Sequence, residues 1–247
     1  MAIPWQVLDR VETAGEGLLE LRMRGKGDFL ITIGPQVLMN SKAQRSEIAL
    51  GRLGCKKLKN HPSPRVLVGG LGMAITLRAV LDELPETAEV VVAELNPKIY
   101  EWCLGPLAEL TDGAAADARV TVAIGDVAEL VKKPTNESFD AIIFDLYRGP
   151  GPQTDRRNDP LYGSRAIEQF RQTLKKNGVF AVWGENPDAG FESRLTSAGF
   201  SVCCERPGKG GYRHAVWVAE KKVAKKPQQS RAGTTGRTGG KGLNAGT

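Results

Sequence analysis

Three acidic residues stand where apolar runs of this sequence end, and they could share one ligand. Glu94 and Asp145 each close such a run, and Asp126 follows a third run after Gly125. The carboxyl ends of parallel strands meet at one edge of a sheet, so we expect the three carboxylates to lie near one another. Together they would repel a diphosphate and would suit a nucleotide whose positive charge sits on a sulfonium.

A glycine-rich turn between a predicted strand and a predicted helix would hold that ligand from the other side. Residues 65–68 (RVLV) predict a buried strand, and residues 73–84 carry apolar side chains at helical spacing. Gly70 and Gly72 would let the backbone turn tightly and approach a ligand. Glu94 comes 22 residues after Gly72, the spacing at which an acid accepts both hydroxyls of a ribose.

The acids differ in the roles that their positions predict. Glu94 would bind the ribose, whereas Asp126 could accept from the adenine amino group or, equally, cap the short helix that follows it. Asp145 ends a strongly apolar strand, so partial burial would raise its pKa and make it a usable base. We therefore expect Asp145 to be catalytic, orienting an amine nucleophile and taking its proton. In the alternative, Asp145 caps its loop or binds the amino group of the ligand.

From residue 65 onward the chain alternates between apolar runs and stretches with helical spacing. Such alternation predicts an α/β fold with a parallel, doubly wound sheet. We expect seven strands, of which the last two (200–206 and 212–219) form an antiparallel hairpin. This layout resembles the Rossmann-like, seven-stranded S-adenosylmethionine-dependent methyltransferase fold.

The segments on either side of this region predict an appendage and a tail. Residues 1–40 alternate in part and contain glycine turns, which predicts a small N-terminal β-appendage. Ser41 would then cap a helix that continues to about residue 58. The domain prediction is a β-appendage over 1–40, a sulfonium-nucleotide-binding domain over 41–219 and a disordered basic tail over 220–247.

The net charge is a poor guide to partners. The 247 residues carry a formal net charge of +6, but residues 221–247 hold seven Lys or Arg and no acid, which leaves 27 basic and 28 acidic residues elsewhere. The composition of the tail predicts disorder, either as a solubilising extension or as a loose contact with nucleic acid or another polyanion. Nucleic acid is expected to bind through this tail, if at all.

Other features restrict the class of protein further. No apolar run approaches the length of about 18 residues that predicts a membrane span, and the N-terminus has no signal-peptide pattern. We therefore expect a cytoplasmic protein without a membrane partner. The four cysteines form no CxxC pair and there are only two histidines, so no metal site is expected.

The chain resembles the spermidine synthase (polyamine aminopropyltransferase) family over roughly residues 18–219. The resemblance implies that Glu94 and Asp126 hold the adenosine, that Asp145 engages the attacking amine, and that decarboxylated S-adenosylmethionine is the co-substrate, with no metal. The segments that carry it are VLVGG at 66–70, AELN at 93–96, VAIGD at 122–126, FDAIIFD at 139–145 and GPGP at 149–152.

The chain departs from the family pattern on the acceptor side. The family's Gly-Gly-Gly-Asp-Gly loop is replaced by residues 69–73 (GGLGM), which lack the acid for the aminopropyl ammonium. The family's second Asp, three residues after the catalytic acid, is replaced by Arg148, and its Tyr-Gln/His-Glu segment by residues 45–47 (RSE). A cation facing a cationic amine costs about 1–4 kcal/mol at contact distance. Tyr147, Arg148 and Trp183 could line the acceptor pocket, although Trp183 could equally be a core residue.

Three functions follow from these patterns. We expect aminopropyl transfer from decarboxylated S-adenosylmethionine to an amine acceptor. The first alternative is methyl transfer from S-adenosylmethionine to an unknown small molecule, which the missing acid of the glycine loop favours. The second is a non-catalytic nucleotide-binding module. The expected partner is a small-molecule acceptor, and a homodimer is one possible assembly.

Overall fold

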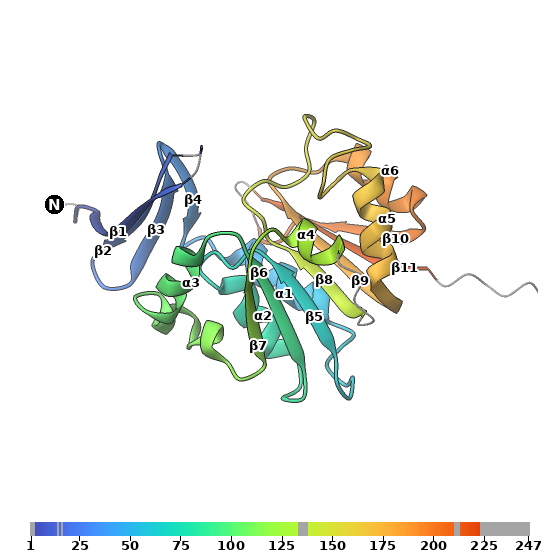
Figure 1. Ribbon diagram of the computed structural model, residues 1–247, viewed down its shortest axis with the longest axis horizontal. Helices are drawn as coiled ribbons and strands as arrows, with labels where there is room; N and C mark the ends of the chain where they lie inside the picture. Colours follow the sequence, from blue (N-terminus) through green and yellow to red (C-terminus); the bar gives the residue numbers. More distant parts are fainter. Residues whose placement is uncertain (1–2, 14, 16, 133–137, 210–212, 223–247) are drawn as a thin grey trace, which may run out of the picture.

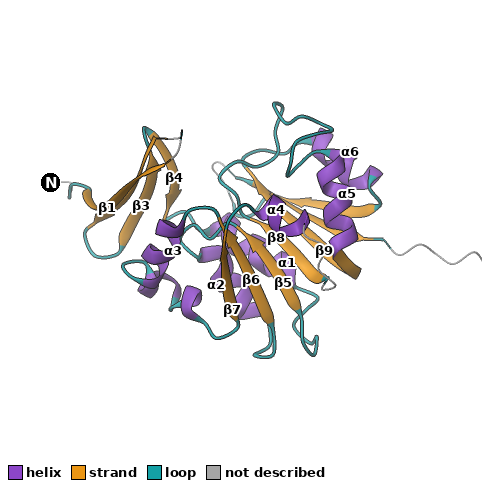
Figure 2. Ribbon diagram, viewed as in Figure 1, coloured by secondary structure: helices purple, strands orange, loops and turns teal. Residues whose placement is uncertain are grey.

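The structure is a computed structural model that describes residues 3–13, 15, 17–132, 138–209 and 213–222. A seven-stranded sheet carries helices on both faces, and a small antiparallel sheet lies beside it at the N-terminal end (Figure 1). The layers of strand and helix are separated by colour in Figure 2. This architecture confirms the predicted fold class, while the predicted tail lies outside the described residues from position 223 onward.

The N-terminal sheet consists of four antiparallel strands in sequential order. Apolar side chains of β2 and β3, among them Leu21 and Ile31, are buried and belong to the same hydrophobic cluster as one face of the main sheet. The sheet therefore packs against the rest of the chain through a shared core. Its strands are β1 (Gln6–Thr13), β2 (Gly17–Arg24), β3 (Asp28–Ile33) and β4 (Gln36–Asn40).

Ser41 does not cap a helix, so that expectation was wrong. Its hydroxyl oxygen accepts a hydrogen bond from the backbone N–H of Phe29 at 2.8 Å, which ties the end of β4 to the start of β3. The first helix, α1 (Arg45–Cys55), begins later, after Gln44, whose side chain makes no capping hydrogen bond. A serine hydroxyl serves any nearby orphan N–H, and here the sheet provides one.

The main sheet has the strand order β10-β11-β9-β8-β5-β6-β7. Strands β5 to β9 pair in parallel, and β11 runs antiparallel between β9 and β10, which confirms the predicted terminal hairpin. From β5 the strand order runs to one side through β6 and β7 and to the other side through β8 and β9. This reversal next to β5 is the topological switch point, where open α/β sheets bind ligands. The strands are β5 (Arg65–Gly69), β6 (Glu89–Glu94), β7 (Val120–Ile124), β8 (Phe139–Phe144), β9 (Leu174–Gly184), β10 (Phe200–Glu205) and β11 (Ala215–Lys221).

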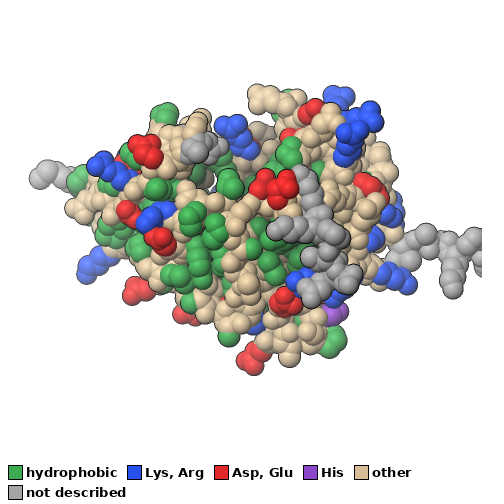
Figure 3. Space-filling view, viewed as in Figure 1, with side chains coloured by type: hydrophobic (Ala, Val, Ile, Leu, Met, Phe, Trp, Pro, Cys, Tyr) green, Lys and Arg blue, Asp and Glu red, His purple; other side chains and the backbone are tan. Residues whose placement is uncertain are grey.

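The helices divide between the two faces of this sheet, and each set buries its own hydrophobic cluster. The first set is α1 with α2 (Ile75–Glu83) and α3 (Pro97–Leu104), followed by the 3-10 turns η1 (Ala108–Thr111) and η2 (Ala114–Ala116). The second set is α4 (Val127–Lys132), α5 (Ser164–Thr173) and α6 (Ala189–Ser197). On the face seen in Figure 3, hydrophobic side chains gather over α3 and the neighbouring strands, beside the N-terminal sheet.

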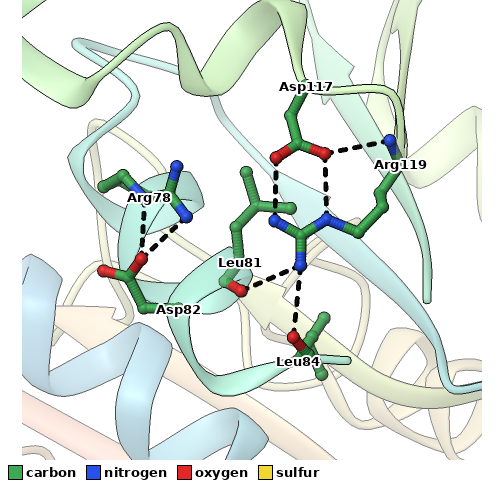
Figure 4. A network of polar contacts seen from close by, with 6 residues as sticks. All are labelled: Arg78, Leu81, Asp82, Leu84, Asp117 and Arg119. Carbon is green, nitrogen blue, oxygen red and sulfur yellow. Dashed lines mark hydrogen bonds and ion pairs between the residues drawn. The ribbon is translucent and has the colours of Figure 1, made fainter. Parts of the chain in front are cut away.

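Arg119 fixes the C-terminal end of α2 (Figure 4). Its guanidinium donates to the carbonyl oxygens of Leu81 at 3.0 Å and Leu84 at 3.2 Å, and it forms a two-pronged ion pair with Asp117. This pairing lowers the pKa of Asp117 to about 2. Because unsatisfied carbonyl groups end every helix, a cation here stabilises α2 and so holds its other end at the ligand edge of the sheet.

Candidate active site

The glycine turn after β5 joins three strands at the carboxyl edge of the sheet. Gly70 has a φ of +88°, and its N–H donates to the carbonyl oxygen of Ala93 at 2.9 Å. A Cβ on Gly70 would lie 2.3 Å from the carbonyl oxygen of Asp145, and one on Gly72 would lie 2.9 Å from the sulfur of Met39. The two glycines are thus required for close packing of the chain itself, and their contact with a ligand stays a prediction.

Glu94 is held directly beneath this turn. One carboxylate oxygen accepts from the backbone N–H of Leu71 at 2.9 Å and the other accepts from that of Asn96 at 2.8 Å. Burial raises the pKa of Glu94, and the backbone donors counteract that rise. The backbone N–H groups of Gly72 and Leu95 also act on this carboxylate, and Glu94 is only 8% exposed, so a ribose hydroxyl would share these oxygens with backbone donors. The geometry is compatible with the predicted contact to a ribose.

Asp126 is exposed, and its carboxylate accepts from the backbone N–H of Ala128 at 2.8 Å. Asp126 therefore caps α4, one of its two predicted roles, and its contact with adenine stays a prediction.

Sequence reasoning missed two apolar neighbours, Leu95 and Ile124, which are 71% and 50% exposed. Ile124 is the pairing partner of Glu94 across β6 and β7, so this edge offers aliphatic surface beside the acids. The signal available in the sequence was the position of these two aliphatic residues: Leu95 directly follows Glu94, and Ile124 ends the apolar run before Asp126.

Asp145 comes directly after β8 and lies against the glycine turn. Its N–H donates to the carbonyl oxygen of Gly69 at 2.9 Å, and its carboxylate accepts from the hydroxyl of Thr76 at 2.6 Å. Burial and the nearby charge of Glu47 raise the pKa of Asp145 to about 7, and the hydrogen bond from Thr76 opposes that rise. A carboxyl group that titrates near neutral pH can act as a proton acceptor for an amine.

A buried polar group behind Asp145 comes from distant parts of the chain. The hydroxyl of Ser46 donates to the carboxylate of Glu47 at 2.7 Å and lies 3.0 Å from Nδ1 of His214. The ring of His214 packs against that of Trp183 with the centroids 4.8 Å apart. Sequence reasoning did not predict Glu47 or Thr76 near Asp145, because α1, α2 and β8 meet only in the folded chain.

A cavity of about 700 Å³ opens between the loops that follow β8 and β9, and Asp145 itself is not part of its described lining. Tyr147 and Arg148, both predicted to contact the acceptor, line it, and the guanidinium of Arg148 lies 5.4 Å from the ring centroid of Tyr147. The hydroxyl of Tyr147 donates to the side-chain oxygen of Gln36, which brings the N-terminal sheet to the cavity. Trp183, the third predicted contact, is half-buried and lies outside this lining.

The described residues contain no group of three or more His, Cys, Asp or Glu side chains placed to hold a metal ion. That the reaction of this chain needs no metal ion stays a prediction. Among the same residues, no helix combines the length and the apolar composition needed to cross a membrane.

Comparison with known proteins places the chain in a family. The family model described as "Spermine/spermidine synthase domain" matches residues 54–193. The polyamine aminopropyltransferase of Clostridium tetani (strain Massachusetts / E88) is 30% identical over 131 residues, which is 53% of this chain and 44% of that protein. That of Saccharolobus solfataricus is 30% identical over 135 residues, covering 55% of this chain and 43% of the relative. The matches thus span less than half the length of these relatives.

Solved structures share the fold. The crystal structure of spermidine synthase from Thermotoga maritima aligns with a TM-score of 0.68 and 21% identity over 88% of this chain and 73% of that chain. A spermidine synthase in complex with the transition state analogue AdoDATO aligns with a TM-score of 0.66 and 20% identity over the same shares. Because the matching family model spans more than half of its 247 residues, this chain belongs to the spermine/spermidine synthase domain family.

Proposed function

We propose that this chain is a transferase that moves an aminopropyl group from decarboxylated S-adenosylmethionine to an amine acceptor. The observation that carries the proposal is the carboxyl group of Asp145, which lies at the switch point of the sheet with a pKa raised to about 7. Membership of the family supports it, as do relatives named polyamine aminopropyltransferases.

The nucleotide would lie across the carboxyl ends of β5, β6 and β7. Glu94 would accept the ribose hydroxyls with carboxylate oxygens that also accept from backbone donors. The adenine would pack on the exposed aliphatic side chains of Leu95 and Ile124, which suit its flat apolar faces. Asp126 would accept from the adenine amino group with the carboxylate that also caps α4. The acids favour a sulfonium over a pyrophosphate because they attract its positive charge.

The chemistry would be a direct displacement at carbon. Asp145 takes a proton from the acceptor ammonium, which frees the nitrogen lone pair. That lone pair attacks the aminopropyl carbon bonded to the sulfonium, the new C–N bond forms and the C–S bond breaks. The electron pair of the broken bond goes to sulfur, so the leaving group is a neutral thioether nucleoside. The chain needs only to align the reactants and to hold the base, both of which raise the rate.

Methyl transfer from S-adenosylmethionine is the second candidate, and one observation favours it. In the turn at residues 69–73 the side chains of Leu71 and Met73 are buried, and the turn supplies no carboxylate for the ammonium of an aminopropyl group. A donor that carries its own carboxylate would meet no repulsion from the turn itself.

Titration calorimetry with the two sulfonium nucleotides tests the proposal. We expect decarboxylated S-adenosylmethionine to bind at least about tenfold more tightly than S-adenosylmethionine, a difference of about 1.4 kcal/mol. Mass spectrometry after incubation with an acceptor amine should then show the mass of one added aminopropyl group. A tenfold preference for S-adenosylmethionine would replace the proposal by methyl transfer, and binding of neither nucleotide would leave no transferase function.

A further inference from the structure

The cavity between the loops after β8 and β9 is lined by three arginines. Arg148 and Arg156 come from the loop after β8, and Arg194 comes from α6. A volume of about 700 Å³ is in the range of small-molecule sites in proteins. Whatever binds in this cavity therefore meets guanidinium groups from two separate elements.

Arg194 is partly unsatisfied in this position. Its Nε donates to the carbonyl oxygen of Tyr162 at 3.0 Å, while its buried Nη2 has no hydrogen-bond partner among the described residues. Burial lowers the pKa of Arg194 and the charge of Arg156 adds to that effect, while the charges of Asp188 and Asp159 oppose it. A buried donor without a partner is costly, and a rotation of the Arg194 side chain toward the cavity would let this group donate to an anionic ligand oxygen, which would also offset the repulsion between the two guanidinium groups.

The acids of the lining do not cancel these cations. The described lining contains two carboxylates, Glu185 and Asp188, against the three arginines. Asp188 caps α6 by accepting from the N–H of Phe191 at 2.8 Å. In the part of the chain that the structure describes, none of the three arginines lies within 4.0 Å of a carboxylate oxygen. The cavity therefore has a positive balance and planar donors suited to a carboxylate or a phosphate.

Arg148 links the cavity to the proposed base. Arg148 follows Asp145 by three residues, so their Cα atoms are at most about 11 Å apart. A short acceptor could place its amine at Asp145 and its other end among the arginines. An acceptor with an ammonium at that other end would instead face like charges.

We propose that the acceptor is an amine whose far end carries an anionic group, a carboxylate or a phosphate, bound by Arg148, Arg156 and Arg194. This inference rests on the proposed function, and it names the substrate class of the same site. The proposed acceptor differs from a polyamine in the charge at one end of the molecule.

A matched set of probes tests the proposal on the full chain. The probes are 4-aminobutanoate, 3-aminopropyl phosphate and 1,4-diaminobutane, which share an amine on a short chain and differ in the charge at the other end. Calorimetry in the presence of the saturating thioether nucleoside, which has no aminopropyl group left to transfer, should show that at least one anionic probe binds at least about tenfold more tightly than the diamine. The anionic probe that binds more tightly identifies the group as carboxylate or phosphate.

Two variants locate the effect, and one serves as the matched control. R194Q and R156Q should each weaken the anionic probe about tenfold or more and leave nucleotide affinity within about twofold. R171Q is the control, because Arg171 also has a buried Nε without a described hydrogen-bond partner but lies outside the cavity. R171Q should leave the probe affinity unchanged.

The outcomes separate this inference from the proposed function. Tighter binding of 1,4-diaminobutane with nucleotide binding intact overturns the anionic acceptor and leaves the transferase in place. Equal loss of affinity in R171Q and R194Q also overturns it, because the effect would then not come from the cavity. Binding of the anionic probe without binding of either sulfonium nucleotide supports the anion site and contradicts the transferase.

Discussion

The nucleotide side and the acceptor side of the candidate site are built in different ways. The centre of the nucleotide side comes from one continuous strand–helix–strand unit, residues 65–94, in which backbone hydrogen bonds hold Glu94 under the glycine turn, and the end of β7 completes it. The acceptor side combines β4, α1, α2, α6 and the loops after β8 and β9. The difference shows that local spacing can encode a nucleotide site, whereas the substrate-selecting surface depends on contacts between distant segments.

The two sides meet where Gly70 contacts the backbone of Asp145. The same carboxyl group is linked to α2 through Thr76 and is influenced by the charge of Glu47 from α1. Changes on either side of this junction should therefore separate binding of the nucleotide from turnover of the acceptor.

The largest separation is expected for D145N. The substitution keeps the shape of the side chain and removes the base, so we expect turnover to fall by about a thousandfold, within the range for loss of a general base. Nucleotide affinity should stay within about tenfold of the original, because Glu94 and the turn remain. Steady-state rates and calorimetry on the same preparation measure both. A fully active D145N protein would remove Asp145 from the mechanism.

The junction itself is tested by G70A. An added Cβ would lie 2.3 Å from the carbonyl oxygen of Asp145, and the φ of +88° is unfavourable for alanine. The matched control is G27A, since Gly27 has a φ of +85° and nothing within 4 Å of the added Cβ. We expect G27A to lower the free energy of unfolding by about 1–2 kcal/mol, the cost of the left-handed conformation alone. G70A should cost about 2 kcal/mol more. Urea unfolding gives both values, and equal losses would show that the junction is not tightly packed.

Sequence patterns predicted the elements that local periodicity controls. Glu94 was predicted to close an apolar strand and is the last residue of β6, and the apolar run before Asp145 correctly indicated burial of that carboxyl group. The strand Gln36–Asn40 was not predicted separately, and the capping role of Ser41 was wrong because its partner lies in a neighbouring strand. Local patterns contain no information on which distant N–H or charge a polar side chain will meet.

The same limit applies to the acceptor side. Tyr147 and Arg148 were predicted to contact the acceptor from their place after the catalytic acid, and both line the cavity. Arg194 was not predicted, because nothing in the spacing of α6 indicates which strand-end loop it will face. Glu47 was noted only as part of a changed motif, and its effect on Asp145 depends on how α1 packs against the sheet.

E94Q should affect the nucleotide side and leave the acceptor side unchanged. The amide keeps one acceptor oxygen, but its NH₂ group would face the N–H of Leu71 or Asn96, each of which now donates to the carboxylate. We expect affinity for the sulfonium nucleotide to fall about tenfold, or about 1.4 kcal/mol. The preference of the cavity among the amine probes should stay as in the unmodified chain. Unchanged nucleotide affinity would place the ribose elsewhere.

The smallest expected effect is a shift of the pH profile in E47Q. The charge of Glu47 raises the pKa of Asp145, so its removal should lower that pKa. The base works when deprotonated, and kcat/KM in the unmodified chain should therefore rise with pH through about 7 and then level off. We expect the midpoint in E47Q to fall by about half a unit to one unit, which makes the variant faster at pH 6 and equal at pH 8.5.

A merely structural role of Glu47 would give a different profile. S46A is the matched control, because it removes the hydroxyl that donates to Glu47 at 2.7 Å and leaves the charge in place. Loss of packing should lower the rate at every pH in either variant without moving the midpoint. A midpoint that moves in E47Q and not in S46A would show that a residue of α1 tunes the base at the end of β8 through its charge. An unmoved midpoint in both would mean that burial alone raises the pKa of Asp145, and the acceptor side would then depend less on distant contacts than its geometry indicates.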